Sequence, residues 1–363
     1  MKNLLTEKHQ IAQSQVAKLA AIAPQLDHLV HSTTPLGVVQ HMLEKQHDLR
    51  FGYSIDDQAR ALIICIWYAA LYGPDKVSDL AHIYFDYLRD AQLPDGRFHN
   101  FRDADGRFID EDGGDDSFGR SVWVLGWILA HKDYFGLHAA ARGLYERARS
   151  ALQPEHLWLR SLAYASLGLR LEEDRSTQEA LINELVKRFL ENSDNEWPWF
   201  EGNLRYANGI LPYALLAASG QSGHEKGLVA LNFLNQVSRI DGVPVPIGNQ
   251  GWHMRNGHRA IYDQQCLEAL DMILANAAAY FRFGNEQYKG EVADWFAWFW
   301  GLNTNGVTLV TDDGGCYDGL GEGTYNVNQG AESTIAYLMS HLAYVAVSRE
   351  DATLLVELNE KAR

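Results

Sequence analysis

Acidic residues stand at the starts of several strongly apolar segments, where they could donate and accept protons. Asp116 is the second residue of the segment DDSFGRSVWVLGWILA, and Asp263 is the first residue of DQQCLEALDMILANAAAYF. One positioned carboxyl group that gives a proton and another that takes one can together perform general acid–base catalysis. We expect Asp116 to be the general acid and Asp263 the general base. Asp57, in the segment DDQARALIICIWYAALYG, is the alternate for either role.

Further charged residues lie close to the same segment starts. Those that we expect to bind a substrate are Asp56, Arg60, Asp115, Arg120, Glu201 and Glu332. Asp56 and Arg60 are four residues apart, as are Asp116 and Arg120, and this spacing allows a salt bridge within a helix. The Asp-Gln dipeptides at Asp57 and Asp263 indicate a register one residue later, so both registers stay open. The arginines could also orient the acids or bind a phosphate or carboxylate.

A structural explanation competes with catalysis for each of these acids. Asp115, Asp116 and Ser117 can cap a helix, because their side-chain oxygens accept hydrogen bonds from its free N–H groups. Acidic residues at this end also complement the helix dipole. Serine or threonine would cap equally well, however, and most of the apolar segments begin with an acid. That regularity favours a shared acidic site.

Two loops combine tryptophan with polar residues and could bind a ring-shaped ligand. The loop Trp197–Glu201 reads WPWFE, and we expect Trp199 to be exposed there as a wall on which a sugar ring stacks. The loop Asn249–Arg255 contains Trp252 and precedes Asp263. Alternatively, these rings fill the core. The remaining candidates for substrate binding flank these loops or the first acidic segment: Tyr53, Arg205, His253, Tyr262 and Gln264.

The sequence predicts no metal site and no cofactor. It contains neither H-E-x-x-H nor C-x-x-C, and three cysteines (Cys65, Cys266 and Cys316) are too few and too scattered for a zinc site or a disulfide framework. The run Thr311–Asp318 resembles a calcium loop superficially but lacks the rest of that pattern. We interpret it as a turn, with a lid over the site as the alternative. There is no phosphate-binding loop and no nucleophile elbow.

Composition excludes several classes of partner. Lys and Arg number 31 against 47 Asp and Glu, for a net charge of −16. Nucleic acid and anionic membranes are therefore not expected as partners. The N-terminus MKNLLTEKHQ has no long apolar run, so we expect no signal peptide, no membrane anchor and a cytoplasmic protein. The 47% of hydrophobic residues and the ten tryptophans allow a large core. Nothing in the sequence indicates an oligomeric state.

A repeated pattern of helices must position the acids. Six apolar helices are expected to begin near Asp57, Asp116, Glu155, Arg205, Asp263 and Glu332. Helices with a polar face should alternate with them at Lys76–Ala91, Tyr134–Leu152, Ser176–Asn192, Glu225–Val237, Glu286–Gly301 and Asp351–Lys361. The apolar segments recur every 40 to 70 residues or so, the scale of repeated supersecondary units. Six such pairs can close into an all-α (α/α)6 toroid with the apolar helices inside.

We expect one domain over residues 1–363, because no linker or low-complexity tract divides the chain. Residues 1–50 should form an N-terminal helix, at 5–30, and an entry segment. Short β-hairpins are expected near Asp95–Asp110, which contains two Asp-Gly-Arg turns, and near Gly306–Thr311. These hairpins would lie in the loops at the mouth of the funnel.

The chain resembles a known family at these helix starts, namely the (α/α)6 six-hairpin-glycosidase-like domains that are often fused to bacterial retaining glycosyltransferases. The matching stretches follow one another in order along nearly the whole chain: Leu36–Leu62, Asp116–Gly126, Trp197–Leu216, Tyr262–Leu270 and Gln329–Leu338. The resemblance implies a toroid, a carbohydrate ligand (an oligosaccharide or other glycoside) and a possible glycosyltransferase partner. Cys266 and Gly202 depart from the family pattern, and the nucleotide-sugar domains of a glycosyltransferase are absent.

Four functions remain open at this point. The first is an inverting glycoside hydrolase, in which two carboxyl groups roughly 6.5–9.5 Å apart protonate the leaving oxygen and activate water. In the second, an inverting phosphorylase, Arg60, Arg120, Arg255 or Arg259 would hold phosphate in place of water. The third is a non-catalytic module that binds a glycan or docks a partner. A terpene-cyclase-like barrel is the fourth, suggested only by a Q-x-x-D-G-like motif at Gln92–Phe98.

Overall fold

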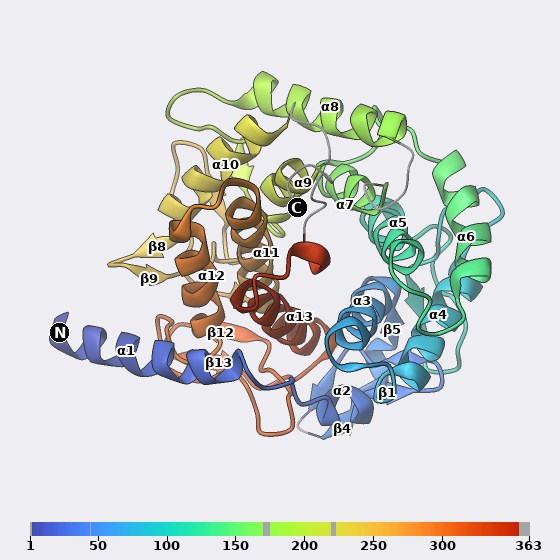
Figure 1. Ribbon diagram of the computed structural model, residues 1–363, viewed down its shortest axis with the longest axis horizontal. Coiled ribbons are helices and arrows are strands. Elements are labelled where there is room, and N and C mark those ends of the chain that lie inside the picture. The colour runs from blue at the N-terminus through green and yellow to red at the C-terminus, as the bar shows by residue number, and fades with distance from the viewer. Residues whose placement is uncertain (1, 44, 170–174, 219–222, 356–363) are drawn as a thin grey trace.

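The computed structural model (Figure 1) describes residues 2–43, 45–169, 175–218 and 223–355. Helices make up most of this part of the chain. The α-helices are α1 (Lys2–Leu19), α2 (Asp27–His31), α3 (Ile55–Tyr72), α4 (Ser78–Ala91), α5 (Gly114–Ala130), α6 (His138–Ser150), α7 (Leu159–Leu169), α8 (Arg175–Asn192), α9 (Ile210–Ala217), α10 (His224–Val237), α11 (Cys266–Phe283), α12 (Glu286–Trp298) and α13 (Ala331–Ser348). Two short 3₁₀ helices are η1 (Leu49–Phe51) and η2 (Ala352–Leu354).

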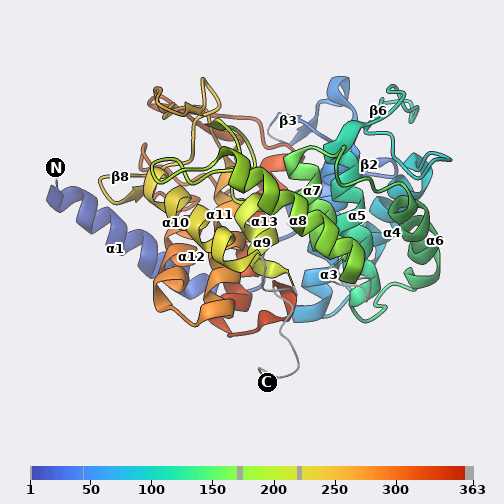
Figure 2. The same cartoon turned by 90° about the horizontal axis from the view of Figure 1, so that it is seen from above.

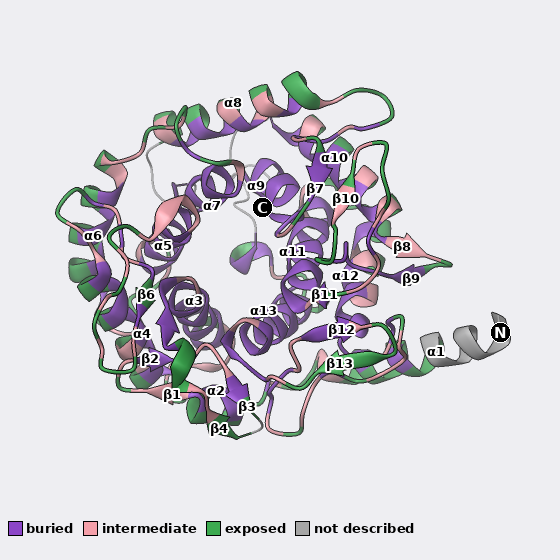
Figure 3. Ribbon diagram, turned by 180° about the vertical axis from the view of Figure 1, so that it is seen from behind, coloured by how far each residue is buried: buried purple, intermediate pink, exposed green. Residues whose placement is uncertain are grey.

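Six helices form a closed inner ring, as the sequence predicts for an (α/α)6 toroid. Each of α3, α5, α7, α9, α11 and α13 contacts the next, and α13 returns to contact α3. Figure 3 shows this ring as largely buried, with α4, α6, α8, α10 and α12 around it. Helix α1 packs against α12 on the outside. Helices α7 and α9 begin four or five residues later than expected, and the others begin close to the predicted positions.

The two rings follow from the pattern of apolar residues. Helix α3 is apolar on every side after its first turn and is buried from Ala59 to Ala69, as a helix surrounded by other helices must be. Helix α4 buries Leu80, Tyr84 and Leu88 on one face and exposes the opposite face. A helix that is apolar on every side therefore lies in the inner ring, and a helix with a single apolar face lies in the outer ring.

Large aromatic rings and small residues share the core. Seven of the ten tryptophans are buried, and those of α3 and α5, Trp67 and Trp127, pack edge to face with centroids 5.4 Å apart. Helices α5 and α7 approach closely at Gly126 and Gly168. A Cβ on Gly126 would lie 2.1 Å from the Gly168 carbonyl oxygen, so a larger residue there would push the two inner helices apart.

In the described part of the chain, thirteen short strands pair in the loops. They are β1 (Thr33–Thr34), β2 (Gly37–Val38), β3 (Met42–Leu43), β4 (Gln46–His47), β5 (Tyr53–Ser54), β6 (Phe101–Arg102), β7 (Asn203–Leu204), β8 (Arg239–Ile240), β9 (Val243–Pro244), β10 (His253–Met254), β11 (Gln264–Gln265), β12 (Gly319–Gly321) and β13 (Thr324–Asn326). Sheets β1–β2, β3–β4, β5–β6, β7–β10 and β8–β9 have two strands, and β11–β12–β13 has three; all pairs are antiparallel.

Many of these loops lie at one end of the ring, seen at the top of Figure 2. Both predicted Asp-Gly-Arg turns are present, because the amide of Leu93 bonds the carbonyl of Arg97 and that of Asp103 bonds Arg107. An isolated bridge between Trp300 and Thr308 marks the second expected hairpin region. The loops therefore cover the ends at which the inner helices begin.

The opposite end of the ring is closed by the chain after α13. Leu354 and Leu355 are buried there, and the hydroxyl of Tyr213 on α9 donates to the carbonyl oxygen of Leu355 at 3.0 Å. The helix expected at Asp351–Lys361 begins with η2, and its residues from 356 onward lie outside the described part of the chain. The last described residues of the chain therefore pack against the inner ring at the end away from the loops.

The N-terminal segment departs from expectation. The helix predicted at 5–30 is divided into α1 and α2, with a non-helical connection between them. In the segments that the structure describes, every helix is too short or too polar to cross a bilayer.

Candidate active site

A cavity of about 330 Å³ opens beside the first turns of α3 and α13, and we call it the mouth cavity. Its lining comes from those two helices and from the loops at the same end of the ring: Gln40, His41, Ser54, Asp56, Asp57, Arg60, Phe101, Gln265, Asp318, Asn328 and Glu332. Four carboxyl groups and one guanidinium among these residues make it a concentrated ionisable site. Such a site in a cleft is a candidate for catalysis.

Asp57 is the most enclosed acid of the mouth cavity, with 5% of its surface exposed. The Ser54 hydroxyl caps α3 by accepting the Asp57 amide at 3.2 Å, and it donates to Asp57 Oδ2 at 2.7 Å. Arg60 Nη2 donates to Oδ1 at 3.0 Å. Burial raises the pKa of Asp57 to about 6, against the opposing effects of Arg60 and Ser54. Asp57 can therefore exchange a proton near neutral pH.

Arg60 joins two inner helices at the floor of this cavity. Its Nη2 also contacts Glu332 Oε2 of α13 at 3.4 Å, and its Nε donates to the carbonyl oxygen of Asp56 at 3.1 Å. The Arg60 side chain is 2% exposed, whereas that of Glu332 is 41% exposed. A single buried guanidinium thus holds the enclosed acid and the open acid side by side.

Arg120 makes a second link between inner helices. Its Nη1 lies 2.8 Å from Asp56 Oδ2 on the neighbouring helix α3. Asp56 therefore pairs with Arg120 rather than with Arg60, and the four-residue register, one of the two left open by the sequence, is not the one observed in α3. The observed bridge within α3 has the three-residue spacing of Asp57 and Arg60. The inner helices lie close enough for Arg120 to reach across, which no spacing within one helix can reveal.

The outer wall of the mouth cavity comes from loops that sequence reasoning did not select. Burial and the neighbouring Glu332 raise the pKa of Asp318, while Asn328 lowers it. His41 stacks on Phe51 with ring centroids 4.0 Å apart, and Phe101 is 41% exposed. Only the run that ends at Asp318 drew attention, as a turn or lid. These residues come from separate loops that are brought together by the fold, and no sequence motif links them.

Asp116 lies three residues into α5 and is not among the residues that line the mouth cavity. The Tyr206 hydroxyl donates to its Oδ2 at 2.7 Å. The expected capping of α5 by Asp115, Asp116 or Ser117 is wrong, since the helix begins earlier and its N-cap is Gly113, without a side-chain bond. Asp115 instead accepts the amide of Trp158 and an ion pair from Arg97, so it positions the start of α7.

Asp263 lies outside the helix that it was expected to begin. It is exposed, with φ of 55°, and its carbonyl oxygen accepts the amide of Asn249. Gln264 and Gln265 then pair as β11 with β12, which delays the helix to Cys266. The two Asp-Gln dipeptides therefore do not share a register, and the catalytic pairing of Asp116 with Asp263 stays a prediction.

Glu268 is the acid of α11 that occupies the position in its helix that Asp57 occupies in α3. Sequence reasoning did not select it. It is the third residue of its helix, as Asp57 is of α3. Its carboxylate accepts the backbone amides of Ala207 and Asn208 and, at 2.9 Å, the side-chain amide of Asn208. Burial raises its pKa to about 7 in spite of these hydrogen bonds. The signal in the sequence was a Glu three residues after the extended Gln-Gln pair.

The expected exposure of Trp199 is wrong. Its ring is fully buried and packs edge to face on Phe200, with Phe233 beside it. The amides of Glu196 and Trp197 bond the Asp194 carboxylate, so this loop turns inward. Trp199 therefore belongs to the core and cannot form the wall of a sugar site in this conformation.

The second aromatic loop is partly exposed. Trp252 has φ of 58°, its indole N–H donates to Asn249 at 2.8 Å, and the Arg205 guanidinium lies 5.4 Å from the ring centroid. His253 pairs in β10 with Leu204 and packs edge to face on Trp197; burial lowers its pKa. These residues form a separate surface and do not line the mouth cavity.

Four further candidates have structural partners. The Tyr53 hydroxyl bonds Thr34 at 2.9 Å, and Gln264 bonds Thr304 and Trp298. Glu201 lies 2.5 Å from Arg160 of α7. The Tyr262 backbone packs against Gly248, where a Cβ would lie 2.1 Å from the Tyr262 carbonyl oxygen. Their roles in binding stay predictions, and their visible contacts stabilise the loops around the mouth.

Two of the three cysteines lie together, in contrast to their separation in sequence. The sulfur atoms of Cys266 and Cys316 are 3.6 Å apart and both residues are free thiols. Among the described residues, no three His, Cys, Asp or Glu side chains are grouped to hold a metal ion.

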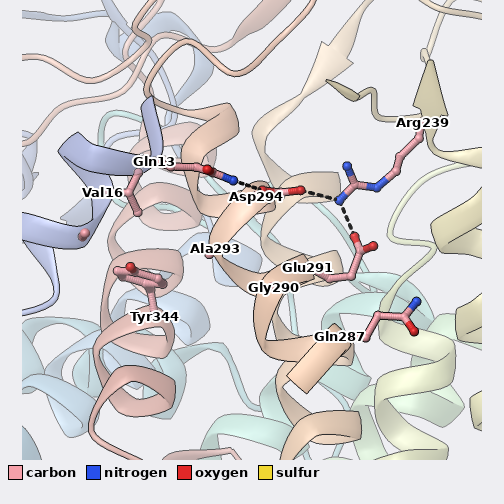
Figure 4. A pocket seen from close by; sticks show the side chains of 10 residues that line it. Gln13, Val16, Arg239, Gln287, Gly290, Glu291, Ala293, Asp294 and Tyr344 are labelled. Carbon is pink, nitrogen blue, oxygen red and sulfur yellow. Dashed lines mark hydrogen bonds and ion pairs between the residues drawn. The ribbon is translucent and has the colours of Figure 1, made fainter. Parts of the chain in front are cut away.

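A second cavity, of about 580 Å³, lies between α1 and the outer helix α12 (Figure 4). Arg239 Nη2 donates to Glu291 at 2.5 Å and to Asp294 at 2.9 Å, and Gln13 donates to Asp294 at 3.0 Å. Arg239 of β8 thus neutralises two acids of α12, and α1 adds only the uncharged Gln13. The cavity also touches Tyr344, far along α13 from the mouth. It is therefore a weaker candidate for catalysis.

Comparison with known proteins supports the fold. No protein-family profile matches the chain, and no curated protein sequence matches it. Among solved structures, a sugar epimerase from a ruminal bacterium is similar with a TM-score of 0.70 and 10% identity, covering 93% of this chain and 98% of that one. A cellobiose 2-epimerase from Spirochaeta thermophila is similar with a TM-score of 0.68 and 13% identity, covering 95% of this chain and 98% of that one. For a GH76 alpha-mannanase from Bacteroides thetaiotaomicron the TM-score is 0.61 and the identity 10%, with 94% of this chain and 96% of that one covered.

These similarities show an (α/α)6 toroid that carbohydrate-active enzymes also use. At such low identity they show the fold and carry no residue assignment.

Proposed function

We propose that the protein is a carbohydrate-processing enzyme that cleaves a glycosidic bond in the mouth cavity. The observation that carries this proposal is the pairing of Asp57 and Glu332 on one nitrogen of Arg60. One acid is buried and protonated more easily, and the other is open to a ligand. Glycoside hydrolysis needs two carboxyl groups in these two states.

Asp57 is suited to be the general acid. Its pKa of about 6 lets the carboxyl group hold a proton at mildly acidic pH and release it near neutrality. Donation of that proton to the glycosidic oxygen would neutralise the leaving group. Ser54 and Arg60 would then stabilise the carboxylate that remains, since both already bond its oxygens.

The spacing of the two acids favours retention over the inversion expected from sequence. Asp57 Oδ1 and Glu332 Oε2 both contact Arg60 Nη2, at 3.0 and 3.4 Å, so they cannot be farther apart than those two distances together. That limit falls short of the roughly 6.5–9.5 Å of inverting enzymes and includes the ~5 Å of retaining ones. Glu332 would be the nucleophile. Inversion would need a carboxylate farther away, such as Asp116.

A second candidate is a sugar epimerase or isomerase. The sugar epimerase and the cellobiose 2-epimerase have higher TM-scores than the mannanase. The cavity, at about 330 Å³, is also small for a polymer. Asp57 would then take a proton from the carbon beside a sugar carbonyl, and Arg60 would stabilise the oxyanion.

The deciding experiment incubates the protein with a panel of disaccharides and oligosaccharides in D₂O, with and without phosphate. Hydrolysis releases new reducing ends, and proton NMR of the first product gives its anomer. Epimerisation releases none and places deuterium on carbon. Strict dependence on phosphate would support the phosphorylase, and sugar binding without any product would support the non-catalytic module. A product formed equally well by Asp57→Asn would refute the role of Asp57.

Association with a glycosyltransferase stays a prediction from the sequence resemblance. A pull-down with a candidate glycosyltransferase, followed by the panel above on the complex, would test it.

A further inference from the structure

Phe101 gives the mouth cavity an apolar wall. Among the described residues that line this cavity, Phe101 of β6 is the only hydrophobic one, and it is 41% exposed. Exposed hydrophobic residues are common on protein surfaces and need no explanation when they stand alone. Phe101 differs because it borders the same cavity as the enclosed acid Asp57 and the open acid Glu332. A ligand that reaches these acids therefore passes beside an exposed aromatic ring.

The register of β5 with β6 directs this ring toward Asp57. Ser54 is the partner of Phe101, and paired residues of antiparallel strands have their side chains on the same face. The next residue, Arg102, points to the opposite face, where its guanidinium is buried 4.5 Å from the centroid of the Tyr87 ring. Phe101 thus shares a face with Ser54, whose hydroxyl donates to Asp57 at 2.7 Å.

The backbone of Phe101 holds it in place, so its ring is open to contact a ligand. Its N–H donates to Asp110 Oδ1 at 2.8 Å, and its carbonyl oxygen accepts from the amide of Ile109 at 3.0 Å. The other oxygen of Asp110 accepts the amide of Asn100 at 2.7 Å. A position that is fixed before the ligand arrives lowers the entropy cost of binding. The hairpin also keeps these bonds when the side chain of Phe101 is replaced.

Gln265 presents a polar group to the same cavity. It is the N-cap residue of α11, and its side chain makes no capping hydrogen bond. The neighbouring Gln264 is buried and bonds Thr304 and Trp298. Gln265, by contrast, is partly exposed, and its side-chain amide has no hydrogen-bond partner within the described residues. An amide has two N–H donors and an acceptor oxygen, so Gln265 can both donate to a ligand and accept from it.

A pyranose ring matches these two surfaces together. Its C–H groups form an apolar face that packs on an aromatic ring, and its hydroxyl groups both donate and accept, as the amide does. The cavity volume of about 330 Å³ is near the lower limit of ligand sites, which is about 300 Å³, so a small ligand is favoured. An open-chain polyol offers the same hydroxyl groups but no rigid apolar face.

We propose that Phe101 and Gln265 form the subsite that holds one pyranose ring of the substrate, with the aromatic ring against the C–H face and the amide on the hydroxyl groups. This inference rests on the proposed function, because the sugar held there is the one beside Asp57. It names the two residues that make the mouth cavity select a cyclic sugar.

The first test measures binding by calorimetry in the Asp57→Asn protein, the parent here, in which turnover is suppressed. The probes are glucose, mannose, cellobiose and mannobiose. Phe101→Leu keeps an apolar side chain but removes the ring, so binding of the tightest probe should weaken about fivefold, whereas Phe101→Tyr should bind within about twofold of the parent. The matched control is Phe283→Leu at the far end of α11, where the residue is 45% exposed; it should leave binding unchanged.

The stacking contact is overturned if Phe101→Leu binds at the parent's affinity, or if Phe101→Tyr or the control Phe283→Leu loses as much affinity as Phe101→Leu. Absence of binding by the parent to every probe would overturn it as well. Circular dichroism and thermal unfolding check that the variants fold, which we expect because the bonds that hold Phe101 come from its backbone.

The second test addresses the amide and the ring form of the sugar. Gln265→Leu keeps the backbone pairing with Gly319 and should weaken binding about fivefold, the effect of a lost hydrogen bond. Sorbitol has hydroxyl groups like those of glucose but no ring, and it should bind about tenfold more weakly than glucose. A folded Gln265→Leu protein with the parent's affinity would contradict the amide contact, and sorbitol bound as tightly as glucose would contradict selection of a ring.

Turnover by proteins that retain Asp57 separates this inference from the proposed function. Because Phe101 binds the sugar and transfers no proton, Phe101→Leu should raise KM about fivefold and change kcat by less than about threefold. Product formed by Phe101→Leu with the KM of the unaltered protein refutes the subsite and leaves the proposed function standing. Ring-dependent binding without any product from the unaltered protein refutes the proposed function and leaves the subsite standing.

Discussion

Asp57 of α3 and Glu268 of α11 occupy the same register, three residues into their helices, yet their surroundings differ. Asp57 borders a cavity and bonds two side chains, Ser54 and Arg60. Glu268 bonds two backbone amides and the amide of Asn208, all in the loop before α9. Burial raises the pKa of both acids. A raised pKa at a helix start therefore does not distinguish the two acids, whereas their hydrogen-bond partners do.

The comparison extends to the two halves of the ring. Around α13, α3 and α5, guanidinium groups link carboxylates of neighbouring helices and leave Glu332 open. Around α7, α9 and α11, Arg160 bonds the carbonyl oxygen of Tyr206 and pairs with Glu201, while Glu268 secures the next residues of that loop. The first half thus leaves one carboxylate, Glu332, open at the mouth cavity, whereas the charged groups of the second half hold the loop before α9.

The largest expected effect is on turnover at α3. Asp57→Asn removes the proton that the carboxyl group donates, so kcat on the substrate found by the glycan panel should fall by about 10²–10⁴-fold. Stability should change little, because the amide keeps hydrogen bonds to Ser54 and can still accept from Arg60. Steady-state kinetics and urea unfolding check both. The control Glu225→Gln, on an acid of α10 with an 80% exposed side chain, should match the unaltered protein.

At α11 we expect the main effect of a substitution to be a loss of stability. Glu268→Leu leaves the buried amides of Ala207 and Asn208 unpaired, which should cost about 3–5 kcal/mol of unfolding free energy. Urea unfolding of the variant beside Glu268→Gln, which keeps one acceptor oxygen, measures this. A Glu268→Leu protein as stable as the parent would break the contrast between the two acids.

The pH dependence of stability should sharpen the same contrast. Glu268 keeps its proton up to about pH 7 in the folded protein, whereas the unfolded chain releases it near 4.5. The folded state thus binds more protons between these values, and stability falls as pH rises through that window. The loss from Glu268 is about 3 kcal/mol, and Asp57 adds a comparable loss between about pH 4 and 6. Unfolding of Glu268→Gln should depend less on pH; an unchanged slope would contradict this origin.

The sequence was sufficient for the ring of helices because that information is local. Apolar residues on every side of α3 and α13 predict burial without knowledge of any partner. The cross-helix contacts are not local: Arg120 bonds Asp56 of another helix, which sequence spacing assigned to Arg60. Likewise, the pairing of β11 with β12 moves Asp263 out of α11.

The site was predictable only in outline, for the same reason. Acids were expected at the inner-helix starts, and Asp56, Asp57, Arg60 and Glu332 do line the mouth cavity. The loops that bring Asp318 and Asn328 to it are short, irregular and held by tertiary contacts. Burial of Trp199 also depends on packing against Phe233, which the loop sequence WPWFE does not encode.

The smallest expected effect concerns an exposed ring at the mouth. Trp158, just before α7, is 71% exposed, and its amide bonds Asp115 of α5. If it stacks on an outer residue of a longer glycan, Trp158→Ala should weaken binding of a tetrasaccharide by about 0.5–1.5 kcal/mol and leave disaccharide binding unchanged. Stability should stay within about 0.5 kcal/mol of the parent. The buried counterpart Trp199→Ala should instead cost about 3–5 kcal/mol of stability. Equal effects of Trp158→Ala on the two glycans, measured by calorimetry, would exclude an outer subsite and leave this ring without a role in binding.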